Sequence, residues 1–436
     1  MNNQLKYYLK RLIRQGFTFN KIFGDLKKSQ YFSKDELYEL QNQKLRKLIH
    51  HCYKNVPYYI DLFRELNLKP DDITIKEDLK KLPFLDKHIV RNNYDKLIAK
   101  NKSKLFCNIG QTSGTTGTPL NLYRDYSSIN FENAVIQRHY ASAASLGLKK
   151  IILRGQIIIP VNQQKPPFWE YNQADNELLM SSYHLSDKTA KIFIEKIKEF
   201  NPQILCAYPS SAYLLAKHFN NLNQQLNLTA VFTSSEKIEE NQRELIEKTF
   251  NCKIYDWYGQ AERASAIGQC EKGTYHIIED YSIVETIETE IGLEMVGTNL
   301  DNYIMPLLRY RTDDTVILSP NDCQCGRYFR KVTEICGRET HYHIVTPESA
   351  KITSAAISLI PRGVNNIIET QFVQEKIGEL IINITANDQF SEKDKELLIK
   401  NTLEHTSPDM KVIINKMESI PRGPNGKFQA VINKLI

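Results

Sequence analysis

The central part of the chain alternates short apolar runs with longer amphipathic segments. Apolar runs at residues 150–153 and 156–159 are typical of buried strands, while residues 188–200 and 239–250 carry apolar side chains at helical spacing. Strands that alternate with helices usually form a parallel sheet with helices on its faces. The pattern therefore predicts an α/β fold for this region.

The pattern changes after this region. Residues 273–320 contain short strand-like runs, among them 274–278 and 282–285, and turns separate these runs from one another. Short strands that follow each other directly, without intervening helices, form antiparallel hairpins and sheets. We therefore predict a β-rich subdomain after the α/β region.

The C-terminal part of the chain combines both kinds of element. Strand candidates at residues 379–385 and 411–415 lie on either side of a helical segment at residues 391–405. This order predicts a small α+β domain at the end of the chain.

The N-terminal segment carries most of the charge asymmetry. Residues 1–30 hold seven basic side chains against Asp25, and this excess equals the formal net charge of +6 of the whole chain. Apolar residues recur there at helical spacing, namely Leu5, Tyr8, Leu9, Leu12 and Ile13. Such a helix could lie on an anionic membrane surface through residues 1–30, or it could pack on its own domain. We favour packing, because Gly16 limits the length of the helix.

Composition limits the class of protein. The chain has 436 residues, of which 41% are hydrophobic and 25% charged, as is ordinary for a soluble globular protein. No apolar run approaches the ~18–20 residues of a membrane-spanning helix, and no signal-peptide pattern is present. Beyond the N-terminal segment no basic stripe alternates with aromatic residues, which argues against nucleic-acid binding. We expect a cytoplasmic protein with reduced cysteines.

A glycine- and hydroxyl-rich segment suggests a phosphate-binding loop. Residues 111–120 read Gln-Thr-Ser-Gly-Thr-Thr-Gly-Thr-Pro-Leu. Glycines allow successive backbone N–H groups to point at one anion, and the hydroxyl groups add further donors. The predicted ATP-binding residues of this loop are Thr112, Ser113, Gly114, Thr115, Thr116 and Gly117. A polar surface turn would have a similar composition.

The order of the residues in this loop is informative. It contains no Gly-x-x-x-x-Gly-Lys-Ser/Thr pattern, which excludes the phosphate loop of ordinary nucleoside triphosphatases. It resembles instead the Ser-Gly-Thr-Thr-Gly-x-Pro loop of the acyl-adenylate-forming enzymes. A single loop is weak evidence, whereas several motifs in family order are strong evidence.

Further motifs follow in the order of this family. Residues 255–262, Tyr-Asp-Trp-Tyr-Gly-Gln-Ala-Glu, resemble its Tyr-Gly-x-x-Glu segment. The resemblance implies that Tyr258 stacks on adenine beside Gly259, that Asp256 accepts the adenine amino group, and that Glu262 holds Mg²⁺. Residues 309–314, Arg-Tyr-Arg-Thr-Asp-Asp, are similar to the Tyr-Arg-Thr-Gly-Asp motif, in which the final carboxylate accepts the ribose hydroxyls. Asp314 takes that position.

Two motifs complete the set. Gly337-Arg338 matches the Gly-Arg pair that precedes the interdomain hinge, and residues 421–427 look like the C-terminal loop that carries the catalytic lysine, here Lys427. Joining a carboxylate to the α-phosphate of ATP brings two anions together, so the site requires cations. Lys427, Arg338 and a Mg²⁺ ion bound to Glu262 would supply them.

The region before the loop suggests a branch of the family. Residues 44–87 resemble the N-terminal region of phenylacetate–coenzyme A ligases and of their relatives in capsular polysaccharide loci. Two departures stand out: Asp313 replaces the glycine of the Thr-Gly-Asp motif, and Glu339-Thr340-His341 stands where the family has its Asp-Asp hinge pair. The hinge residue is therefore not assigned.

The resemblance implies an activity and an architecture. The activity is ATP-dependent formation of an acyl-adenylate with release of pyrophosphate, followed by acyl transfer to coenzyme A. The alternative is transfer to an amine of a sugar or amino acid during surface-polysaccharide or secondary-metabolite synthesis. A further alternative is that the enzyme transfers AMP to a cofactor. The last is that the protein is a degenerate nucleotide-binding scaffold without activity. Candidate acid-binding residues are Tyr208, Pro209, Ser234 and Trp257.

The expected architecture has three parts. Residues 1–36 form a basic helical segment, and residues 37–338 form an adenylation domain of α/β subdomains with parallel sheets plus the β-rich subdomain. Residues 339–436 form a small mobile α+β domain that carries Lys427. The acid itself cannot be named from these motifs, and a homodimer is left open.

Four residues form a candidate metal site. Cys270 and His276 follow the Glu262 motif, and Cys323 and Cys325 lie near the end of the β-rich region. Two cysteine knuckles from neighbouring hairpins could hold a structural Zn²⁺ ion with tetrahedral geometry, although the spacing is not that of a zinc finger. Reduced cysteines and a hydrogen-bonded histidine are the alternative.

Overall fold

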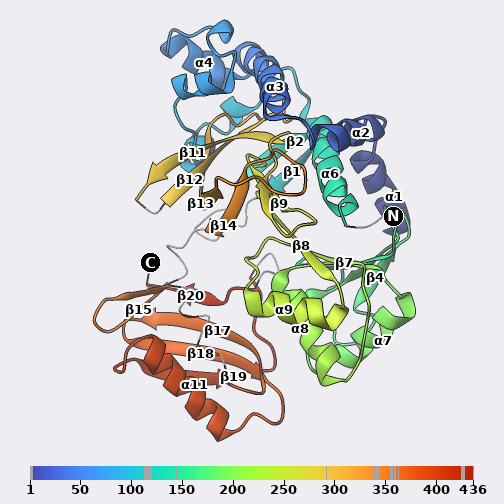
Figure 1. The fold of residues 1–436 in the computed structure, drawn as a ribbon, viewed down its shortest axis with the longest axis vertical. Coiled ribbons are helices and arrows are strands. Elements are labelled where there is room, and N and C mark those ends of the chain that lie inside the picture. Colours follow the sequence, from blue (N-terminus) through green and yellow to red (C-terminus); the bar gives the residue numbers. More distant parts are fainter. Residues whose placement is uncertain are drawn as a thin grey trace. The chain divides into compact units, whose positions relative to one another are not determined.

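The computed structural model divides the chain into two compact units, which are described separately (Figure 1). It describes residues 3–111, 120–143, 146–160, 162–290, 292–336, 343–353, 357, 360–361, 363–423 and 428–435. Unit one comprises Met1–Leu148, Asn172–Glu177 and Tyr255–Cys336, and unit two comprises Lys149–Tyr171, Leu178–Ile254 and Gly337–Ile436. Within the described residues, no helix is long and apolar enough to span a membrane.

Unit one combines N-terminal helices with antiparallel strands. Its helices are α1 (Asn3–Arg14), α2 (Phe19–Ser29), α3 (Lys34–Asn55), α4 (Pro57–Glu65), α5 (Lys87–Asn92) and α6 (Tyr126–Ala141), with short 3₁₀ turns η1 (Pro70–Asp72), η2 (Lys76–Lys81), η3 (Asp95–Leu97) and η4 (Lys104–Phe106). Its strands are β1 (Cys107–Gln111), β2 (Asn121–Asp125), β8 (Lys253–Gly259, which begins in unit two), β9 (Ala266–Gln269), β10 (Tyr275–Ile277), β11 (Ser282–Thr289), β12 (Gly292–Asn299), β13 (Tyr310–Ser319) and β14 (Lys331–Cys336).

The larger sheet of unit one confirms the predicted β-rich region. Its strands run in the order β11-β12-β13-β14-β10-β9-β8, and each neighbouring pair is antiparallel. β1 and β2 form a separate two-stranded hairpin. The runs predicted at residues 274–278 and 282–285 correspond to β10 and β11.

Side chains at the helix ends explain where the helices of unit one begin. Ser33 caps α3 in a capping box, since its hydroxyl accepts the Glu36 N–H at 3.2 Å while the Glu36 carboxylate accepts the Ser33 N–H at 2.8 Å. Asp125 caps α6 by accepting the N–H of Ser128 at 2.9 Å. Each contact satisfies a backbone donor that the helix itself leaves without a partner.

The core of unit one joins the N-terminal helices to the β-rich region. Leu45, Leu48 and Ile49 of α3 are fully buried in a cluster that also contains Tyr59 of α4 and Leu308 before β13. The Tyr59 hydroxyl accepts the N–H of Leu308 at 2.9 Å. The helices therefore belong to the same folded body as the strands.

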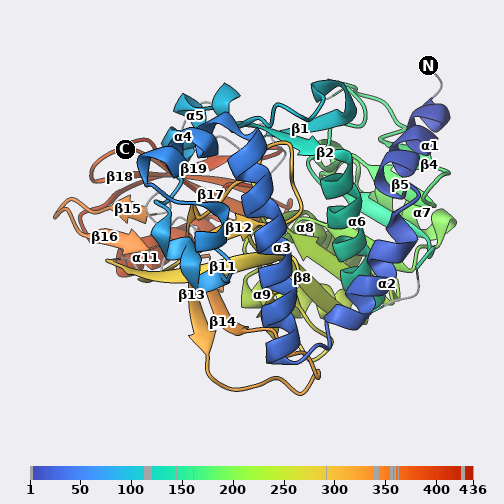
Figure 2. The same cartoon turned by 90° about the horizontal axis from the view of Figure 1, so that it is seen from above.

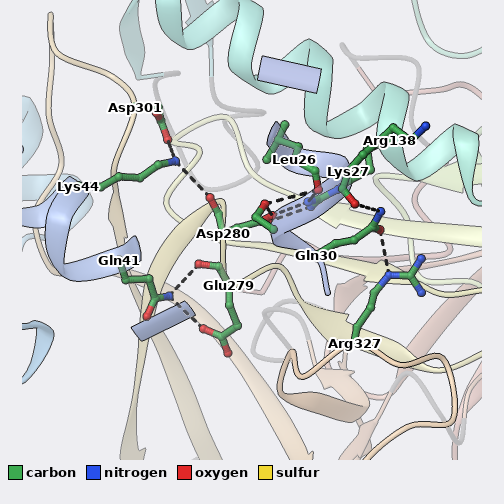
Figure 3. Close-up of polar contacts among 11 residues, drawn as sticks. Leu26, Lys27, Gln30, Gln41, Lys44, Arg138, Glu279, Asp280, Asp301 and Arg327 are labelled. Carbon is green, nitrogen blue, oxygen red and sulfur yellow. Dashed lines mark hydrogen bonds and ion pairs between the residues drawn. The ribbon is translucent and has the colours of Figure 1, made fainter. Parts of the chain in front are cut away.

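A buried polar network anchors α2 to the rest of unit one (Figure 3). The guanidinium of Arg138 on α6 forms an ion pair with Asp280, and it also donates to the carbonyl of Leu26 on α2 at 2.9 Å. The side chains of Arg138 and Asp280 are 6% and 0% exposed. Removing one partner of such a buried pair leaves an uncompensated charge, which costs about 3–5 kcal/mol. The network therefore fixes α2 against α6.

Unit two begins with the predicted α/β region. Its strands are β3 (Lys150–Leu153), β4 (Trp169–Asn172), β5 (Glu177–Met180), β6 (Ile204–Ala207) and β7 (Ala230–Ser234), and its helices are α7 (Ala190–Phe200), α8 (Pro209–Asn221) and α9 (Glu240–Phe250), with η5 (Ser182–His184). The strand order is β7-β6-β3-β5-β4, and the central strands β3, β6 and β7 are parallel. The predicted helices at 188–200 and 239–250 correspond to α7 and α9.

One predicted strand is wrong. Residues 156–159 follow β3 but form no strand, and Ile157 is exposed. Gly155 precedes this run and Pro160 follows it, and proline lacks the N–H that a strand donates to its neighbour. The apolar residues of the run therefore do not indicate a buried strand.

The end of unit two is the predicted small α+β part. Strands β17 (Ile367–Lys376), β18 (Glu379–Ala386), β19 (Lys411–Lys416) and β20 (Val431–Asn433) form a four-stranded sheet in the order β19-β18-β17-β20. Helix α11 (Glu392–His405) lies across this sheet in Figure 1, and its Leu398 is buried against Ile382 and Ile384. A short hairpin of β15 (His343–Val345) and β16 (Lys351–Thr353) precedes the sheet.

The α/β class with a β-rich part and a small α+β part is therefore confirmed. The domain boundaries at residues 36/37 and 338/339, and the mobility of the C-terminal part, remain predictions. Residues 337–342, which include the expected hinge, lie outside the described residues.

Candidate functional site

The described residues show the base of the predicted phosphate loop. β1 and β2 are antiparallel, and Gln111 pairs with Asn121 at the end of the hairpin. The predicted ATP-binding residues Thr112, Ser113, Gly114, Thr115, Thr116 and Gly117 lie outside the described residues. The hairpin thus brings the two ends of the segment together, and the binding role of the segment stays a prediction.

A partly buried cation, not foreseen from the sequence, lies at this hairpin. The guanidinium of Arg124 on β2 lies so close to Gly110 on β1 that a Cβ atom there would collide with it. Arg124 donates to the carbonyl of Ala261, and its Nε has no hydrogen-bond partner in the described part of the chain. Burial, and then the nearby Arg263, lower the pKa of Arg124 to about 10. The guanidinium therefore remains charged at neutral pH.

Strand β8 presents two of the predicted nucleotide-binding residues. Alternation along a strand places the side chains of Asp256 and Tyr258 on one face and Trp257 on the other. The Tyr258 hydroxyl donates to the carboxylate of Asp314 at 2.6 Å. Burial, and then Asp314, raise the pKa of Tyr258 well above its ordinary value. Tyr258 thus stays protonated and links two motifs that lie 56 positions apart in the sequence.

The neighbouring residues of β8 are also held. Asp256 accepts the hydroxyl of Tyr275 at 3.0 Å, and its side chain is buried. At Gly259 a Cβ atom would lie 2.9 Å from Nε1 of Trp257, so the indole leaves little room for a larger residue. The strand end therefore has a fixed geometry before any nucleotide binds.

The motif that contains Asp314 has a left-handed turn. Asp313 has a φ of 58°, a conformation that glycine adopts freely and that aspartate tolerates better than most residues. The backbone N–H of Asp313 donates to Glu294 at 3.3 Å, and Asp314 donates to the hydroxyl of Thr312 at 3.1 Å. The replacement of glycine by Asp313 is thus compatible with the turn that positions Asp314.

The predicted magnesium ligand is buried beside the same strand. Glu262 is 8% exposed and accepts the hydroxyl of Tyr310 at 2.9 Å through Oε1. Tyr310 is the first residue of β13, the strand that also contains Asp314. The side chains thus form two hydrogen-bonded pairs, Tyr258 with Asp314 and Glu262 with Tyr310, and each pair includes one residue of β13.

The candidate acid-binding residues are divided between the units. Tyr208 and Pro209 start α8, and Ser234 ends β7, all in unit two. Trp257 belongs to unit one, where it is buried in an apolar cluster and its ring centroid lies 5.0 Å from that of His139. No described contact tests the acid-binding role of these residues.

A buried carboxylate, also missed from the sequence, joins two parts of unit two. Glu236 follows β7, and its oxygens accept the backbone N–H of Ser210 at 3.0 Å and of Phe428 at 2.9 Å. Ser210 is in the first turn of α8, and Phe428 directly follows Lys427 in sequence. Burial raises the pKa of Glu236, and the hydrogen bonds from Ser210 and Phe428 oppose that rise.

A second contact holds the N-terminal end of the predicted lysine loop, residues 421–427. Arg422 pairs with Glu369 on β17 at 2.6 Å, and both side chains are 8% exposed. The Arg422 guanidinium lies 4.7 Å from the ring centroid of Phe428. The contacts of Arg422 and Phe428 therefore hold the chain on both sides of segment 424–427. Lys427 itself, like Arg338, lies outside the described residues.

The four predicted metal ligands converge in unit one. The ligand atoms of Cys270, His276, Cys323 and Cys325 all lie within 4.8 Å of one another. The Sγ atoms of Cys270 and Cys323 are 3.8 Å apart, and Sγ of Cys325 is 3.5 Å from Nε2 of His276. Two thiolates on one tetrahedral zinc ion, each with a bond of about 2.3 Å, are separated by about 3.8 Å. The group therefore has the donor set and the size of a closed zinc site.

The histidine of this group is oriented by its other ring nitrogen. Nδ1 of His276 lies 3.1 Å from the carbonyl of Phe329, which can only accept a hydrogen bond. The proton therefore resides on Nδ1, and Nε2 faces the thiols with its lone pair. Burial lowers the pKa of His276, which favours this neutral form.

Comparison with known proteins shows similarity over nearly the whole chain. Residues 344–434 match the family described as the CapK C-terminal domain. Protein CapK of Staphylococcus aureus is 29% identical over 423 residues, covering 92% of this chain and 90% of that protein. Phenylacetate-coenzyme A ligase of Thermus thermophilus is 23% identical over 437 residues, covering 92% and 97%.

Solved structures share the fold. The structure of a 2-hydroxyisobutyryl-CoA ligase in the postadenylation state, in complex with R3-HIB-AMP, has a TM-score of 0.70. It is 14% identical, and the similarity covers 94% of this chain and 92% of that one. The relatives and the shared fold support the resemblance that the motifs indicate, to the acyl-adenylate-forming superfamily and within it to the phenylacetate–coenzyme A ligases and CapK proteins.

Proposed function

We propose that this protein uses ATP to activate a carboxylic acid as an acyl-adenylate, releases pyrophosphate, and transfers the acyl group to coenzyme A. The observation that carries the proposal is the contact between Tyr258 and Asp314, which unites two nucleotide-binding motifs far apart in sequence. The similarity to phenylacetate-coenzyme A ligases over most of the chain supports the same reaction class. We propose a cytoplasmic location, because the proposed reaction uses ATP and coenzyme A.

The proposed nucleotide site has a defined division of roles. Asp314 accepts the ribose hydroxyls, Tyr258 stacks on adenine, and Asp256 accepts the adenine amino group. The hydroxyls and backbone N–H groups of residues 112–117 bind the phosphates. Carboxylate oxygens suit Mg²⁺, and the buried Glu262 would hold that ion.

Positive charge is needed where the phosphates and the carboxylate meet. Lys427 and Arg338 fill this role by motif, and we add Arg124, whose guanidinium lies at the base of the phosphate loop. Charges that are already in position stabilise the transition state without a cost of reorganisation. The partly satisfied guanidinium of Arg124 supports this assignment.

The acceptor has a second candidate. This second proposed acceptor is an amine, on a sugar or an amino acid, in polysaccharide or secondary-metabolite synthesis, and the match of residues 344–434 to the CapK C-terminal domain is consistent with it. Acid-dependent consumption of coenzyme A thiol supports the first acceptor, whereas an amide product supports the second. The acid-binding residues proposed for both are Tyr208, Pro209, Ser234 and Trp257.

We further propose a structural Zn²⁺ ion on Cys270, His276, Cys323 and Cys325. The convergence of the four ligand atoms and the hydrogen bond of His276 Nδ1 support it. Four protein ligands leave no open position, so such an ion would stabilise the β-rich region rather than act on the substrate.

A panel of carboxylic acids tests the proposed reaction. Purified protein is incubated with ATP, Mg²⁺ and each acid, and pyrophosphate release is measured with and without coenzyme A. One or more acids should stimulate release above the acid-free background. If ATP binds but no acid in a broad aromatic and aliphatic panel stimulates release, the scaffold alternative replaces this proposal.

A further inference from the structure

Helix α1 presents its apolar side to solvent. Leu5, Tyr8, Leu9, Leu12 and Ile13 are all exposed, and Leu12 is the most exposed of them at 64%. With 3.6 residues per turn these positions share one face of the helix. Phe17, in the turn that follows α1, is also fully exposed. An exposed apolar face of this kind indicates a surface that binds something apolar.

The opposite face of α1 packs on unit one. Tyr7 is buried there, and Arg11 on that side donates to the carbonyl of Ala174 and lies 3.8 Å from Asp175. Partial burial lowers the pKa of Lys10. The helix therefore packs through its polar and basic side. This orientation is the reverse of that expected when a helix buries its apolar face in its own domain.

Contacts with α6 fix this orientation. The Tyr126 hydroxyl donates to the carbonyl of Leu12 at 2.9 Å, and Asn130 Nδ2 donates to the carbonyl of Ile13 at 2.9 Å. Asn133 donates to the carbonyl of Arg14 at 3.2 Å. These side chains satisfy carbonyls that the end of a helix leaves without partners. Rotation of α1 about its axis would break the contacts, so the apolar face stays outward.

The support of α1 is itself rigidly attached. Figure 2 shows α1 and α2 beside α6, and the network of Figure 3 ties α2 to α6 through Arg138, Asp280 and the carbonyl of Leu26. Gln30, just after α2, accepts a hydrogen bond from Arg327 at 3.1 Å. The exposed face is therefore held on a folded support and is not a loose extension of the chain.

We propose that α1 and Phe17 form a docking surface for an anionic lipid bilayer. Lys6 borders the apolar face, and its long side chain can reach the headgroups while the leucines enter the acyl boundary. The excess charge of the whole chain, +6, resides in residues 1–30. A second copy of the chain would bring an equal positive charge to the same face, whereas anionic lipid complements it.

This docking is independent of the adenylation chemistry. One short amphipathic helix gives weak and reversible binding, so the protein would exchange between the membrane surface and solution.

Vesicle sedimentation of the full chain tests the proposal. Vesicles of phosphatidylglycerol with an equal amount of phosphatidylcholine are compared with pure phosphatidylcholine vesicles. The protein should bind the anionic vesicles, and added salt should weaken that binding. The double variant Leu9→Ser with Leu12→Ser should bind at least about tenfold more weakly. The matched control changes two exposed aliphatic residues elsewhere, Leu105→Ser with Ile157→Ser, and should bind as the unchanged protein does.

Several outcomes would overturn the proposal. Absence of binding to anionic vesicles is one, and equal loss of binding in the control variant is another. A dimer in light scattering that the Leu9 and Leu12 substitutions abolish would make α1 an interface between copies instead. Thermal unfolding and acid-stimulated pyrophosphate release without vesicles, measured on both variants, should be unchanged, which separates this test from that of the proposed enzyme function.

Discussion

The carboxylate of Glu236 accepts the backbone N–H of Phe428 at 2.9 Å, although the two residues are 192 positions apart in sequence. The same carboxylate accepts the N–H of Ser210, so both of its oxygens are used. Phe428 is the residue after Lys427, which is the proposed catalytic lysine. We expect Glu236 to influence that lysine through the backbone of Phe428, as a positioning residue.

Glu236→Gln should slow acyl-adenylate formation. Glutamine has the same shape but only one carbonyl oxygen, so it can keep one of the two N–H contacts and places its own amide N–H₂ against the other. We expect a decrease of about 10- to 100-fold in the rate of adenylation, because small displacements of a catalytic group have effects of this size. Stopped-flow measurement of pyrophosphate release gives this rate.

Glu418→Gln is the control, because Glu418 lies in the same region as Glu236 but its side chain is exposed. Glu418 pairs with Lys188 at 2.6 Å between the same two parts of unit two, yet both side chains are more than 70% exposed. Glu418→Gln should leave the rate within about twofold, since exposed ion pairs contribute little. Equal losses in both variants, or a slower transfer step from supplied acyl-adenylate in Glu236→Gln, would contradict a specific role in adenylation.

Lys427→Ala should separate the two half-reactions. Loss of one preorganised cation should slow acyl-adenylate formation by about 10²–10³-fold, equivalent to about 3–4 kcal/mol. Transfer from a chemically supplied acyl-adenylate should change far less, because the C-terminal part rotates the lysine away in the proposed cycle. Equal damage to both steps, measured by single-turnover kinetics, would contradict the rotation.

Asp314→Asn should weaken ATP binding. The variant loses a charged acceptor for the ribose hydroxyls, which is worth about 1.5–3 kcal/mol, or roughly 10- to 100-fold in affinity. Calorimetric titration with ATP measures this change. Asp313→Gly is the matched control, because glycine accepts the φ of 58° without strain and keeps the N–H that donates to Glu294. Weak ATP binding in the glycine variant would show that Asp313 has its own role.

The double variant Cys323→Ser with Cys325→Ser should lose zinc. Protein purified without chelators should contain about one zinc ion per chain, and the variant should contain close to none. Its unfolding midpoint should fall by several degrees, while ATP binding is partly retained. Cys336→Ser, which changes a cysteine of unit one outside the group, should retain the metal. Unchanged zinc in the double variant, measured by mass spectrometry, would refute the ligand assignment.

The stability of unit one should decrease in mild acid because of His139. Burial lowers the pKa of His139 from 6.5 to about 3, so the unfolded chain takes up a proton between these values while the folded chain does not. The free energy of unfolding should therefore fall as the pH decreases from 6.5 towards 3, by about 1.4 kcal/mol per pH unit at most. His139→Gln should show a weaker pH dependence in urea unfolding. An unchanged slope would mean that other groups cause it.

Several parts of the fold could be predicted because they follow from local pattern. The period of apolar residues located α7, α9, β10 and β11 within a few residues. The same method failed at residues 156–159, because composition alone does not show that Gly155 and Pro160 end the strand pairing.

The site was predictable where residue type limits the chemistry. Cysteine and histidine are residue types that bind zinc, so the proximity of Cys270, His276, Cys323 and Cys325 could be inferred although the order of strands could not. Arg124 and Glu236 were missed, because an arginine in a strand and a glutamate after one are ordinary in sequence. Their roles depend on contacts with Ala261 and Phe428, which only tertiary structure brings together.

Periodicity also could not give the orientation of α1. The spacing of Leu5, Leu9 and Leu12 identifies an apolar face, but the direction of that face depends on what the other side contacts. Asn130 and Tyr126, more than a hundred positions away, decide it. The packing that we favoured from sequence is present, but through the basic side.

The shared guanidinium of Arg138 has a consequence for how this chain can diverge. It donates to the Leu26 carbonyl of α2 and forms an ion pair with Asp280 at the same time. One charge on α6 therefore connects α2 with the turn before β11. A chimera with a relative should therefore take residues 138 and 280 from the same parent, because either charge alone would be buried without its partner. The acceptor at Leu26 is a backbone carbonyl, so the side chain of residue 26 can change without loss of this contact.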